Sequence, residues 1–289
     1  MAPASLRALL AGLIDYAGLF PPAELPLSDV VTNYRSYLDS PDAWALGRLV
    51  LPAARLADLA KLLTADAPVW RVSALVGEDV RADAACILAA RSMGRICVDV
   101  AELRASSPQD VELAARVLEP VPVVYVEVAV ADDPTSLIRA VAGVGLRAKI
   151  RTGGTVREAF PTADNCAQFI ACCAAHHVAF KATAGLHHPL RGTYRLTYGD
   201  DAPRGEMFGF LNLFLAGSFA RQGMTAEETA LVLVETDLRQ FHFDAAGVSW
   251  RGHALSMEQV ARARESFAIS FGSCSFREPI DDLTQLGLL

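Results

Sequence analysis

Three lysines, Lys61, Lys149 and Lys181, stand out in this sequence because arginine supplies the other 23 of its 26 basic residues. Since the chain uses arginine wherever a positive charge suffices, a position that keeps lysine indicates a need for an amine. A guanidinium stays protonated and is a poor nucleophile, whereas a buried ammonium can lose its proton. Lys61 lies in a polar helical stretch and is interpreted as a solvated residue, while Lys149 and Lys181 lie in apolar runs.

The two lysines in apolar runs are expected to lie on adjacent strands. Lys149 and Arg151 alternate by two, which places them on one face of a strand. A cation directed into a protein interior must meet a carboxylate, bind an anion or lower its pKa. Crowding by Lys149 and Arg151 is expected to lower the pKa of Lys181, which makes its amine a nucleophile for Schiff-base chemistry on a carbonyl. The alternative is a structural ion pair, for instance of Lys149 with Glu127.

Two adjacent histidines, His187 and His188, follow the run that holds Lys181. One imidazole is expected to serve as a general acid or base or to bind phosphate. A hydrogen-bonded loop histidine is the simpler alternative. A metal site would need three or four ligands, with Asp15, Asp99, Glu102 or Glu127 completing it. Because no HxH or HExxH spacing is present, neither a metal nor a cofactor is predicted.

Two turns complete the set of candidate residues. Asp15 follows an apolar stretch and either caps or binds backbone amides, or lies over a barrel mouth as a catalytic carboxylate. Near the other end of the chain, Gly272, Ser273 and Ser275 form a turn that is typical of an anion-binding nest. Cys274 within that turn is interpreted as a buried thiol, because no histidine is close to it in the sequence.

Short β-branched runs alternate with amphipathic stretches, and the runs start roughly 25 residues apart. The predicted strands are Leu46–Pro52, Trp70–Gly77, Arg95–Val100, Pro122–Val130, Arg147–Gly153 and Ala179–Gly185. The predicted helices between them are Arg55–Thr64, Asp79–Ser92, Pro108–Leu118, Pro134–Val144 and Asp164–His176. This alternation indicates βαβ units and an α/β fold. Its regularity favours a closed (β/α)8 TIM barrel over a doubly wound sheet, since no GxGxxG follows the first strand.

After residue 190 this alternation breaks down, which predicts an elaborated C-terminal third. The expected elements are a polar loop over Leu190–Pro203, a buried helix over Phe208–Gln222, a helix over Thr225–Thr236, a hairpin over Phe241–Gly252, a helix over Ser256–Phe267 and a last strand over Ala268–Phe276. The seventh strand of the barrel is not apparent. No linker or repeat is found, so residues 1–289 are predicted to form a single TIM-barrel domain, with its site at the C-terminal strand ends.

Composition excludes several classes of protein. The net charge of −7 argues against a nucleic-acid binder, and a hydrophobic fraction of 52% argues against a disordered chain. The six cysteines include no CxxC pair and are interpreted as free thiols in a reducing compartment. No apolar run is long enough to cross a membrane, and Ser5–Ile14 is too short for a convincing signal peptide. A cytoplasmic protein is therefore expected.

Several of these motifs resemble those of deoxyribose-phosphate aldolases. Lys149-Ile-Arg-Thr-Gly153, followed by Phe180-Lys-Ala-Thr-Ala-Gly185, is similar to their adjacent strands, one ending in E-T-G and the next carrying the Schiff-base lysine in F-x-K-T-S-T-G. Leu13–Leu19 is similar to the family's I-D-H-T-x-L. Phe271–Ser275 is similar to its F-G-x-S-S, which donates to phosphate. The resemblance implies a TIM barrel in which Lys181 forms the imine.

The sequence also departs from that family. The family has a second lysine on the strand after the Schiff-base strand, whereas no lysine follows Lys181 here. Arg151 stands where the family's E-T-G has its acid, and the strand predicted at Pro122–Val130 disturbs a one-to-one count of strands. Lys149 could supply the second positive charge from the preceding strand.

These observations predict a class I aldolase-like lyase for a small, anionic, sugar-phosphate-like carbonyl compound. The catalytic candidates are Lys181, Lys149, Asp15, Glu127 and His187. The substrate-binding candidates are Arg151, Gly153, His188, Gly272, Ser273 and Ser275. One alternative is a metal-dependent barrel lyase or hydrolase that uses His187 or His188 with acidic strand ends. The other is a non-catalytic barrel that binds an anionic metabolite. A homo-oligomer is left open, and neither a nucleic-acid partner nor a membrane is expected.

Overall fold

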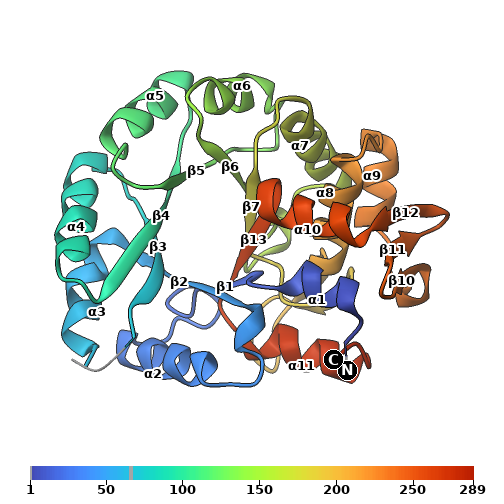
Figure 1. Ribbon diagram of the computed structural model, residues 1–289, viewed down its shortest axis with the longest axis horizontal. Coiled ribbons are helices and arrows are strands. Elements are labelled where there is room, and N and C mark those ends of the chain that lie inside the picture. The colour runs from blue at the N-terminus through green and yellow to red at the C-terminus, as the bar shows by residue number, and fades with distance from the viewer. Residues whose placement is uncertain (1, 65–67) are drawn as a thin grey trace.

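The computed structural model describes residues 2–64 and 68–289, which form a closed barrel of eight parallel strands (Figure 1). Around the barrel the strands follow the order β1-β13-β7-β6-β5-β4-β3-β2. They are β1 (Ile14–Tyr16), β2 (Leu46–Pro52), β3 (Trp70–Leu75), β4 (Ile96–Arg104), β5 (Val123–Glu127), β6 (Arg147–Arg151), β7 (Phe180–Thr183) and β13 (Ala268–Ser273). The predicted α/β TIM barrel is confirmed.

Helices between the first seven strands form the outer ring of the barrel (Figure 1). After α1 (Ala4–Leu10), which precedes the barrel, they are α2 (Leu27–Leu38), α3 (Leu56–Leu62), α4 (Val80–Ser92), α5 (Pro108–Val117), α6 (Thr135–Gly143) and α7 (Ala163–Ala175). Short 3₁₀ helices lie at Ala43–Ala45, Ala53–Arg55, Arg157–Ala159 and Leu238–Gln240. The start of α5 illustrates the local code: Ser107 and Asp110 form a capping box around Pro108, so the backbone N–H groups of the first turn are satisfied.

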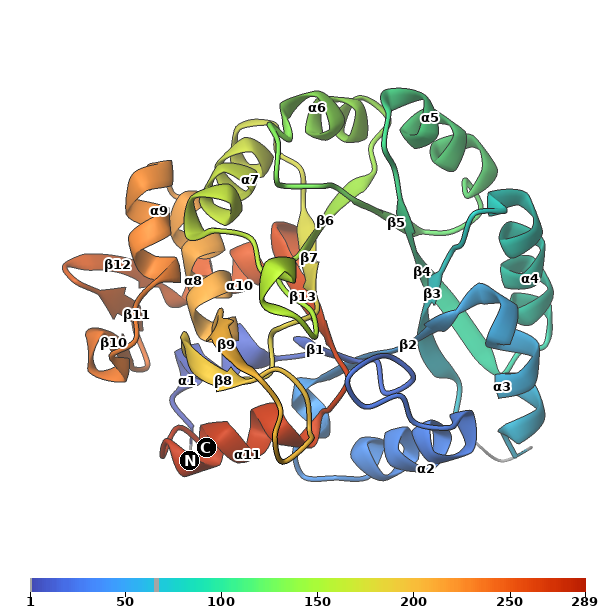
Figure 2. The same ribbon diagram turned by 180° about the vertical axis from the view of Figure 1, so that it is seen from behind.

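Between β7 and β13 the chain adds a hairpin, several helices and a small sheet instead of a single helix (Figure 2). The added elements are β8 (Gly192–Arg195), β9 (Arg204–Met207), α8 (Phe210–Ala220), α9 (Ala226–Leu233), β10 (Phe241–Phe243), β11 (Gly247–Trp250), β12 (His253–Ser256) and α10 (Met257–Ser266). After β13 the chain continues into α11 (Arg277–Gln285). The elaborated C-terminal third is thus confirmed.

Three predictions about elements need correction. The strand that was not apparent is the first one, β1, because β7 pairs directly with β13 and leaves no place between them. With three residues, β1 is too short to show a strand period and follows an apolar stretch that resembles a helix. The polar loop over Leu190–Pro203 contains β8, which pairs with β9. The hairpin over Phe241–Gly252 gains a third strand, β12.

The core surrounds the barrel strands, and every residue of α8 is buried, as predicted. Phe180 of β7 makes edge-to-face contacts with Phe169 of α7 and Phe267 after α10, so β7 is fixed from outside by aromatic packing. Among residues 2–64 and 68–289, no helix combines the length and apolar character that crossing a membrane requires. The six cysteines, all in this part of the chain, form no disulfide there. That residues 1–289 form one domain stays a prediction.

Candidate active site

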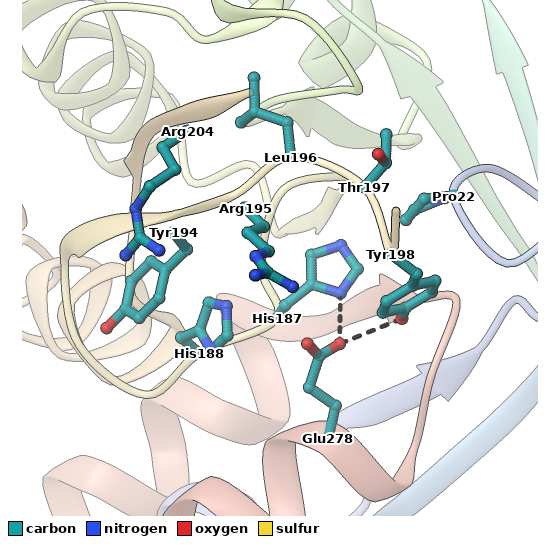
Figure 3. Close-up of a pocket in the computed structure, with 10 residues that line it drawn as sticks. All are labelled: Pro22, His187, His188, Tyr194, Arg195, Leu196, Thr197, Tyr198, Arg204 and Glu278. Atoms are coloured by element: carbon teal, nitrogen blue, oxygen red, sulfur yellow. Dashed lines mark hydrogen bonds and ion pairs between the residues drawn. The ribbon is translucent and has the colours of Figure 1, made fainter. Parts of the chain in front are cut away.

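Among the cavities at the C-terminal end of the barrel, an inner and an outer one share His187 in their lining. The inner cavity, of about 260 Å³, reaches Lys149, Lys181 and Glu102 inside the barrel. Its mouth is formed by loops that follow β1, β6, β7 and β13, including Phe20, Pro21, Thr155 and Cys274. The outer cavity, of about 270 Å³, lies under the β8–β9 connection (Figure 3). Both cavities lie where the predicted site was expected in a parallel barrel.

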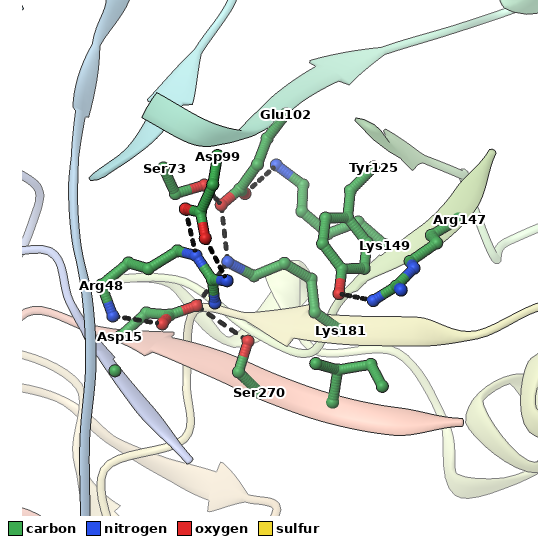
Figure 4. Close-up of polar contacts among 12 residues, drawn as sticks. Asp15, Arg48, Ser73, Asp99, Glu102, Tyr125, Arg147, Lys149, Lys181 and Ser270 are labelled. Atoms are coloured by element: carbon green, nitrogen blue, oxygen red, sulfur yellow. Dashed lines mark hydrogen bonds and ion pairs between the residues drawn. The ribbon is translucent and has the colours of Figure 1, made fainter. Parts of the chain in front are cut away.

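Lys181 is the centre of a buried ion-pair cluster inside the barrel (Figure 4). Its Nζ donates to Asp15 Oδ2 at 2.7 Å and to Glu102 Oε1 at 2.6 Å, and its side chain is 1% exposed. It also lies 5.6 Å from the centre of the Tyr125 ring. Burial acts to lower the pKa of Lys181, but Asp15 and Glu102 overcome burial and raise that pKa above its ordinary value. Lys181 is therefore held as an ammonium in the structure.

Lys149 lies beside Lys181, because the two residues are register partners on β6 and β7. Its Nζ lies 2.9 Å from Glu127 Oε2 and 3.1 Å from Glu102 Oε2. The ion pair of Lys149 with Glu127 that the sequence offered as a structural alternative is thus present. The expected strand adjacency is also present, so the two amines open on one cavity.

Glu102 joins the two lysines, whereas the sequence indicates it only as a candidate metal ligand. It accepts from both amines and also from Ser73 Oγ at 2.6 Å. Burial acts to raise the pKa of Glu102, but Lys181 and Lys149 lower it to about 2. The expectation that Lys149 and Arg151 lower the pKa of Lys181 is wrong for this arrangement, because a carboxylate lies between the two amines and neutralises their repulsion.

Asp15 binds a backbone amide, which is one of its two predicted roles, while its role as a catalytic carboxylate stays a prediction. On β1 it accepts from the backbone N–H of Arg48 at 2.7 Å, and its other oxygen accepts from Ser270 Oγ at 2.8 Å and from Lys181. Gly47 allows this placement, since a Cβ there would collide with Asp15 Oδ1. The segment that follows Asp15 lies over the barrel mouth, where Ala17 and Phe20 line the inner cavity.

Arg151 and Gly153 lie near the inner cavity in different ways. Arg151 lines it, with a side chain that is 43% exposed and an Nε that lies 3.3 Å from Glu127 Oε1. Gly153 packs under the ring of Phe160, where any Cβ would collide, and the next residue, Gly154, lines the cavity. Gly153 is thus required for close packing rather than for a contact with the cavity.

Some polar groups of the turn after β13 make contacts within the protein. Gly272 lines the inner cavity, and Ser273 is buried at the end of β13. Ser275 Oγ accepts from the backbone N–H of Glu278 at 3.1 Å, so it stabilises the first turn of α11. The hydroxyl of Ser275 is therefore engaged by the protein itself, and anion binding by this turn stays a prediction.

The two histidines are held by carboxylates of α11. His187 Nδ1 lies 3.0 Å from Glu278 Oε2, and His188 Nδ1 lies 2.6 Å from Asp282 Oδ2. Burial acts to lower the pKa of His187, but contacts with Cys274 and Glu278 raise it to about 10. His187 is thus an imidazolium at neutral pH. Cys274, which had no histidine nearby in the sequence, lies within the same cluster, with Sγ 3.3 Å from Tyr198 Oη.

Several residues of the site could not be predicted from the sequence. They are Ser73, Tyr125, Tyr194, Arg195, Tyr198, Arg204, Ser270 and Glu278. Tyr125 and Ser270 lie inside predicted strands, but no rarity of residue type marked them as it marked Lys149. Within residues 2–64 and 68–289, no group of three or more His, Cys, Asp or Glu side chains is arranged to hold a metal ion.

Comparison with known proteins gives a match in fold. No protein-family model matches the chain, and no curated protein matches it. Among solved structures, the chain is similar to a deoxyribose phosphate aldolase from Aeropyrum pernix, which is described as having a unique tetrameric structure. The TM-score is 0.53 at 12% sequence identity, and the match covers 98% of each chain. The resemblance suggested by the motifs is thus confirmed at the level of the barrel.

Proposed function

We propose that this protein is a class I aldolase-like lyase that acts on a small anionic carbonyl compound through a lysine Schiff base. The observation that carries the proposal is the pair Lys149 and Lys181, in register on adjacent strands and open to one cavity of about 260 Å³. Amines beside carboxylates at the C-terminal end of a TIM barrel provide both a nucleophile and proton acceptors. The aldolase-like fold of the barrel supports the same reaction class.

The chemistry requires a neutral amine, and the carboxylates in contact with Lys181 are the groups that can receive its proton. Asp15 and Glu102 each lie within 2.7 Å of Lys181 Nζ. The freed amine attacks the carbonyl carbon, and loss of water gives an iminium. A carboxylate removes the proton of the substrate's β-hydroxyl group, and the C–C bond breaks. One fragment leaves as a carbonyl compound, while the electron pair of the broken bond converts the iminium into an enamine. Protonation and hydrolysis of the enamine return the amine. His187, which lines the same cavity, is suited to donate a proton there.

Either Lys181 or Lys149 can be assigned as the lysine that forms the imine, and different observations support each assignment. The likeness of the motif at Phe180–Gly185 assigns it to Lys181, but the raised pKa of Lys181 works against attack by that amine. The resembled family has its second lysine on the strand after the Schiff-base strand. Lys149 and Lys181 occupy consecutive strands in that order, so this order favours Lys149 as nucleophile with Lys181 as the neighbouring cation. We keep Lys181 as the first assignment and Lys149 as the competing one.

Borohydride trapping tests the proposal. The protein is incubated with short aldehydes and ketones, with and without a phosphate group, then reduced and mapped by peptide mass spectrometry. We expect a covalent adduct on one of the two barrel lysines and its loss in the Lys181→Arg or the Lys149→Arg variant. Lys61, whose side chain is 75% exposed, provides the matched control through Lys61→Arg. A substrate that is turned over without any adduct, or adducts spread equally over all three lysines, would overturn the proposal.

A second candidate function is a non-catalytic barrel that binds an anionic metabolite. The full pairing of both amines with carboxylates favours it, because paired lysines can be purely structural. This candidate requires ligand binding without turnover and tolerance of Lys181→Arg. The metal-dependent alternative is tested by metal analysis of the purified protein. The tetrameric solved neighbour makes a homo-oligomer an expectation that light scattering can check, and the cytoplasmic location stays an expectation.

A further inference from the structure

The outer cavity is a feature that the lysine chemistry does not use. Its walls come from the loop after β7, the β8–β9 hairpin with its connection, and the start of α11. Figure 3 shows the side chains of Arg195, Arg204, His187 and His188 around one space. The cavity has a volume of about 270 Å³, which suits a small group rather than a macromolecular segment.

The charges around this cavity do not balance. Among the described residues, no carboxylate lies within 4.0 Å of the guanidinium of Arg195 or Arg204. Arg204 Nη2 donates to the backbone carbonyl of Thr193 at 2.6 Å, which fixes its position without neutralising it. Glu278 is the acidic residue that lines the cavity, and it already accepts from His187 and from Tyr198 Oη at 3.1 Å. The wall therefore carries an excess of positive charge.

The aromatic and imidazole side chains that line the outer cavity are held in place by contacts with neighbouring residues. The ring of His188 stacks on Tyr194 with centroids 3.6 Å apart, and its Nδ1 contacts Asp282. His187 is fixed by Glu278 and stays protonated because its contacts raise its pKa to about 10. Fixed donors beside guanidinium groups that lack a carboxylate partner are suited to recognise a planar or tetrahedral oxyanion.

We propose that the outer cavity binds an oxyanion group, a phosphate monoester or a carboxylate, through Arg195 and Arg204. The site itself stands on the uncompensated arginines. Its assignment to the anionic end of the substrate rests on the proposed function, because His187 lies between this cavity and the one that holds the amines. The substrate would then be a short carbonyl compound whose anionic group lies at the end remote from the carbonyl.

Calorimetric titration with inorganic phosphate and, separately, with acetate tests the site. We expect the double variant Arg195→Ala/Arg204→Ala to weaken binding of at least one probe by about tenfold or more, which is the loss of charge-assisted hydrogen bonds. The matched control is Arg81→Ala/Arg116→Ala, which removes the same charge from exposed positions on α4 and α5. Tighter binding of phosphate than of acetate identifies a phosphate ester as the ligand class, and the reverse order identifies a carboxylate.

Equal loss of binding in the test and control variants would overturn the proposal, as would failure of both probes to bind the wild-type protein. If Lys149→Met abolishes anion binding and the double arginine variant does not, the anion binds in the inner cavity, and this result would also overturn the proposal. The melting temperature of each variant verifies that the protein is folded. The proposed lyase activity and the proposed oxyanion site can fail independently. If no adduct forms on Lys149 or Lys181 but phosphate binding still depends on the two arginines, the lyase activity is excluded and the oxyanion site is retained.

Discussion

The inner and outer cavities of this barrel share His187 but handle charge in opposite ways. In the inner cavity, Lys149 and Lys181 stand on strands, are nearly fully buried, and each meets two carboxylate oxygens. In the outer cavity, Arg195 and Arg204 belong to an added hairpin, are exposed, and lack a carboxylate partner among the described residues. The lysines of the inner cavity are paired with carboxylates of the protein, whereas the arginines of the outer cavity can still pair with a bound anion.

The difference follows from solvation. An unpaired ammonium inside the barrel would lose its hydration without compensation, so burial there demands Asp15 and Glu102. An arginine at the surface keeps its water and needs no partner until a ligand arrives. The inner cavity is therefore expected to be sensitive in stability to any change of charge, and the outer cavity to be sensitive in ligand binding.

Removal of the shared carboxylate should have the largest effect. Glu102→Gln keeps the shape of the side chain but leaves two buried ammonium groups with one carboxylate fewer, which should cost about 3–5 kcal/mol in the free energy of unfolding. Urea denaturation measures it. The control Glu206→Gln removes an exposed partner of Arg191 and should cost less than about 1 kcal/mol. Equal losses in the two variants would erase the contrast between buried and exposed pairs.

A steric change should act on the same cluster more mildly. The methyl group of Gly47→Ala would collide with Asp15 Oδ1, which must then move away from the backbone of Arg48 and from Lys181. We expect a loss of about 1–3 kcal/mol in the free energy of unfolding. The control is Gly143→Ala, because no atom lies near the position of the added methyl group. Gly94→Ala is not a suitable control, because the positive φ of Gly94 would itself strain an alanine. An unchanged stability in Gly47→Ala would show that Asp15 is not held tightly.

The shared histidine should show a pH-dependent contribution to stability. Because the folded-state pKa of His187 is about 10 and the ordinary value is 6.5, its proton stabilises the folded state fully below pH 6.5. That contribution is lost as the pH rises through about 10. His187→Gln should therefore cost about 1–2 kcal/mol at pH 6 and progressively less toward pH 10.

Urea denaturation across this pH range, with His242→Gln at an exposed position as control, measures the effect. A difference between His187→Gln and the wild-type protein that grows toward alkaline pH would contradict the assigned direction of the pKa shift.

The smallest effect on stability is expected at the outer cavity. Arg195→Ala removes an exposed side chain without a carboxylate partner, so the free energy of unfolding should stay within about 0.5 kcal/mol of the wild-type value. Urea denaturation of Arg195→Ala beside Glu102→Gln compares the two cavities directly. A loss comparable to that of Glu102→Gln would mean that Arg195 serves the fold rather than a ligand.

Local patterns sufficed for the regular part of the barrel. The strands β2 to β7 are apolar runs between amphipathic helices, and their consecutive order correctly put the strand of Lys149 beside that of Lys181. β1 was missed because three residues carry no measurable period. The strand predicted to end at Val100 continues to Arg104, with a register shift against β3, so the inward position of Glu102 could not be assigned.

The electrostatics of the site depended on contacts that no local pattern encodes. Asp15 and Lys181 are 166 residues apart, and Glu102 and Lys181 are 79 apart. Without those partners, the sequence could indicate that Lys181 is buried but gave the wrong direction for its pKa. The arginines of the outer cavity lay in a stretch predicted to be a loop, where side-chain directions are undefined.

The position of β13 also imposes an order on biosynthesis. This strand fills the gap between β1 and β7, pairing Phe271 with both Ile14 and Ala182. A nascent chain that has not yet released residue 273 from the ribosome therefore carries two open sheet edges, which are templates for pairing with other chains. Asp15 meanwhile lacks Ser270. Ring closure must therefore wait until β13 has been released, and a product cut before β13 would expose the barrel lysines.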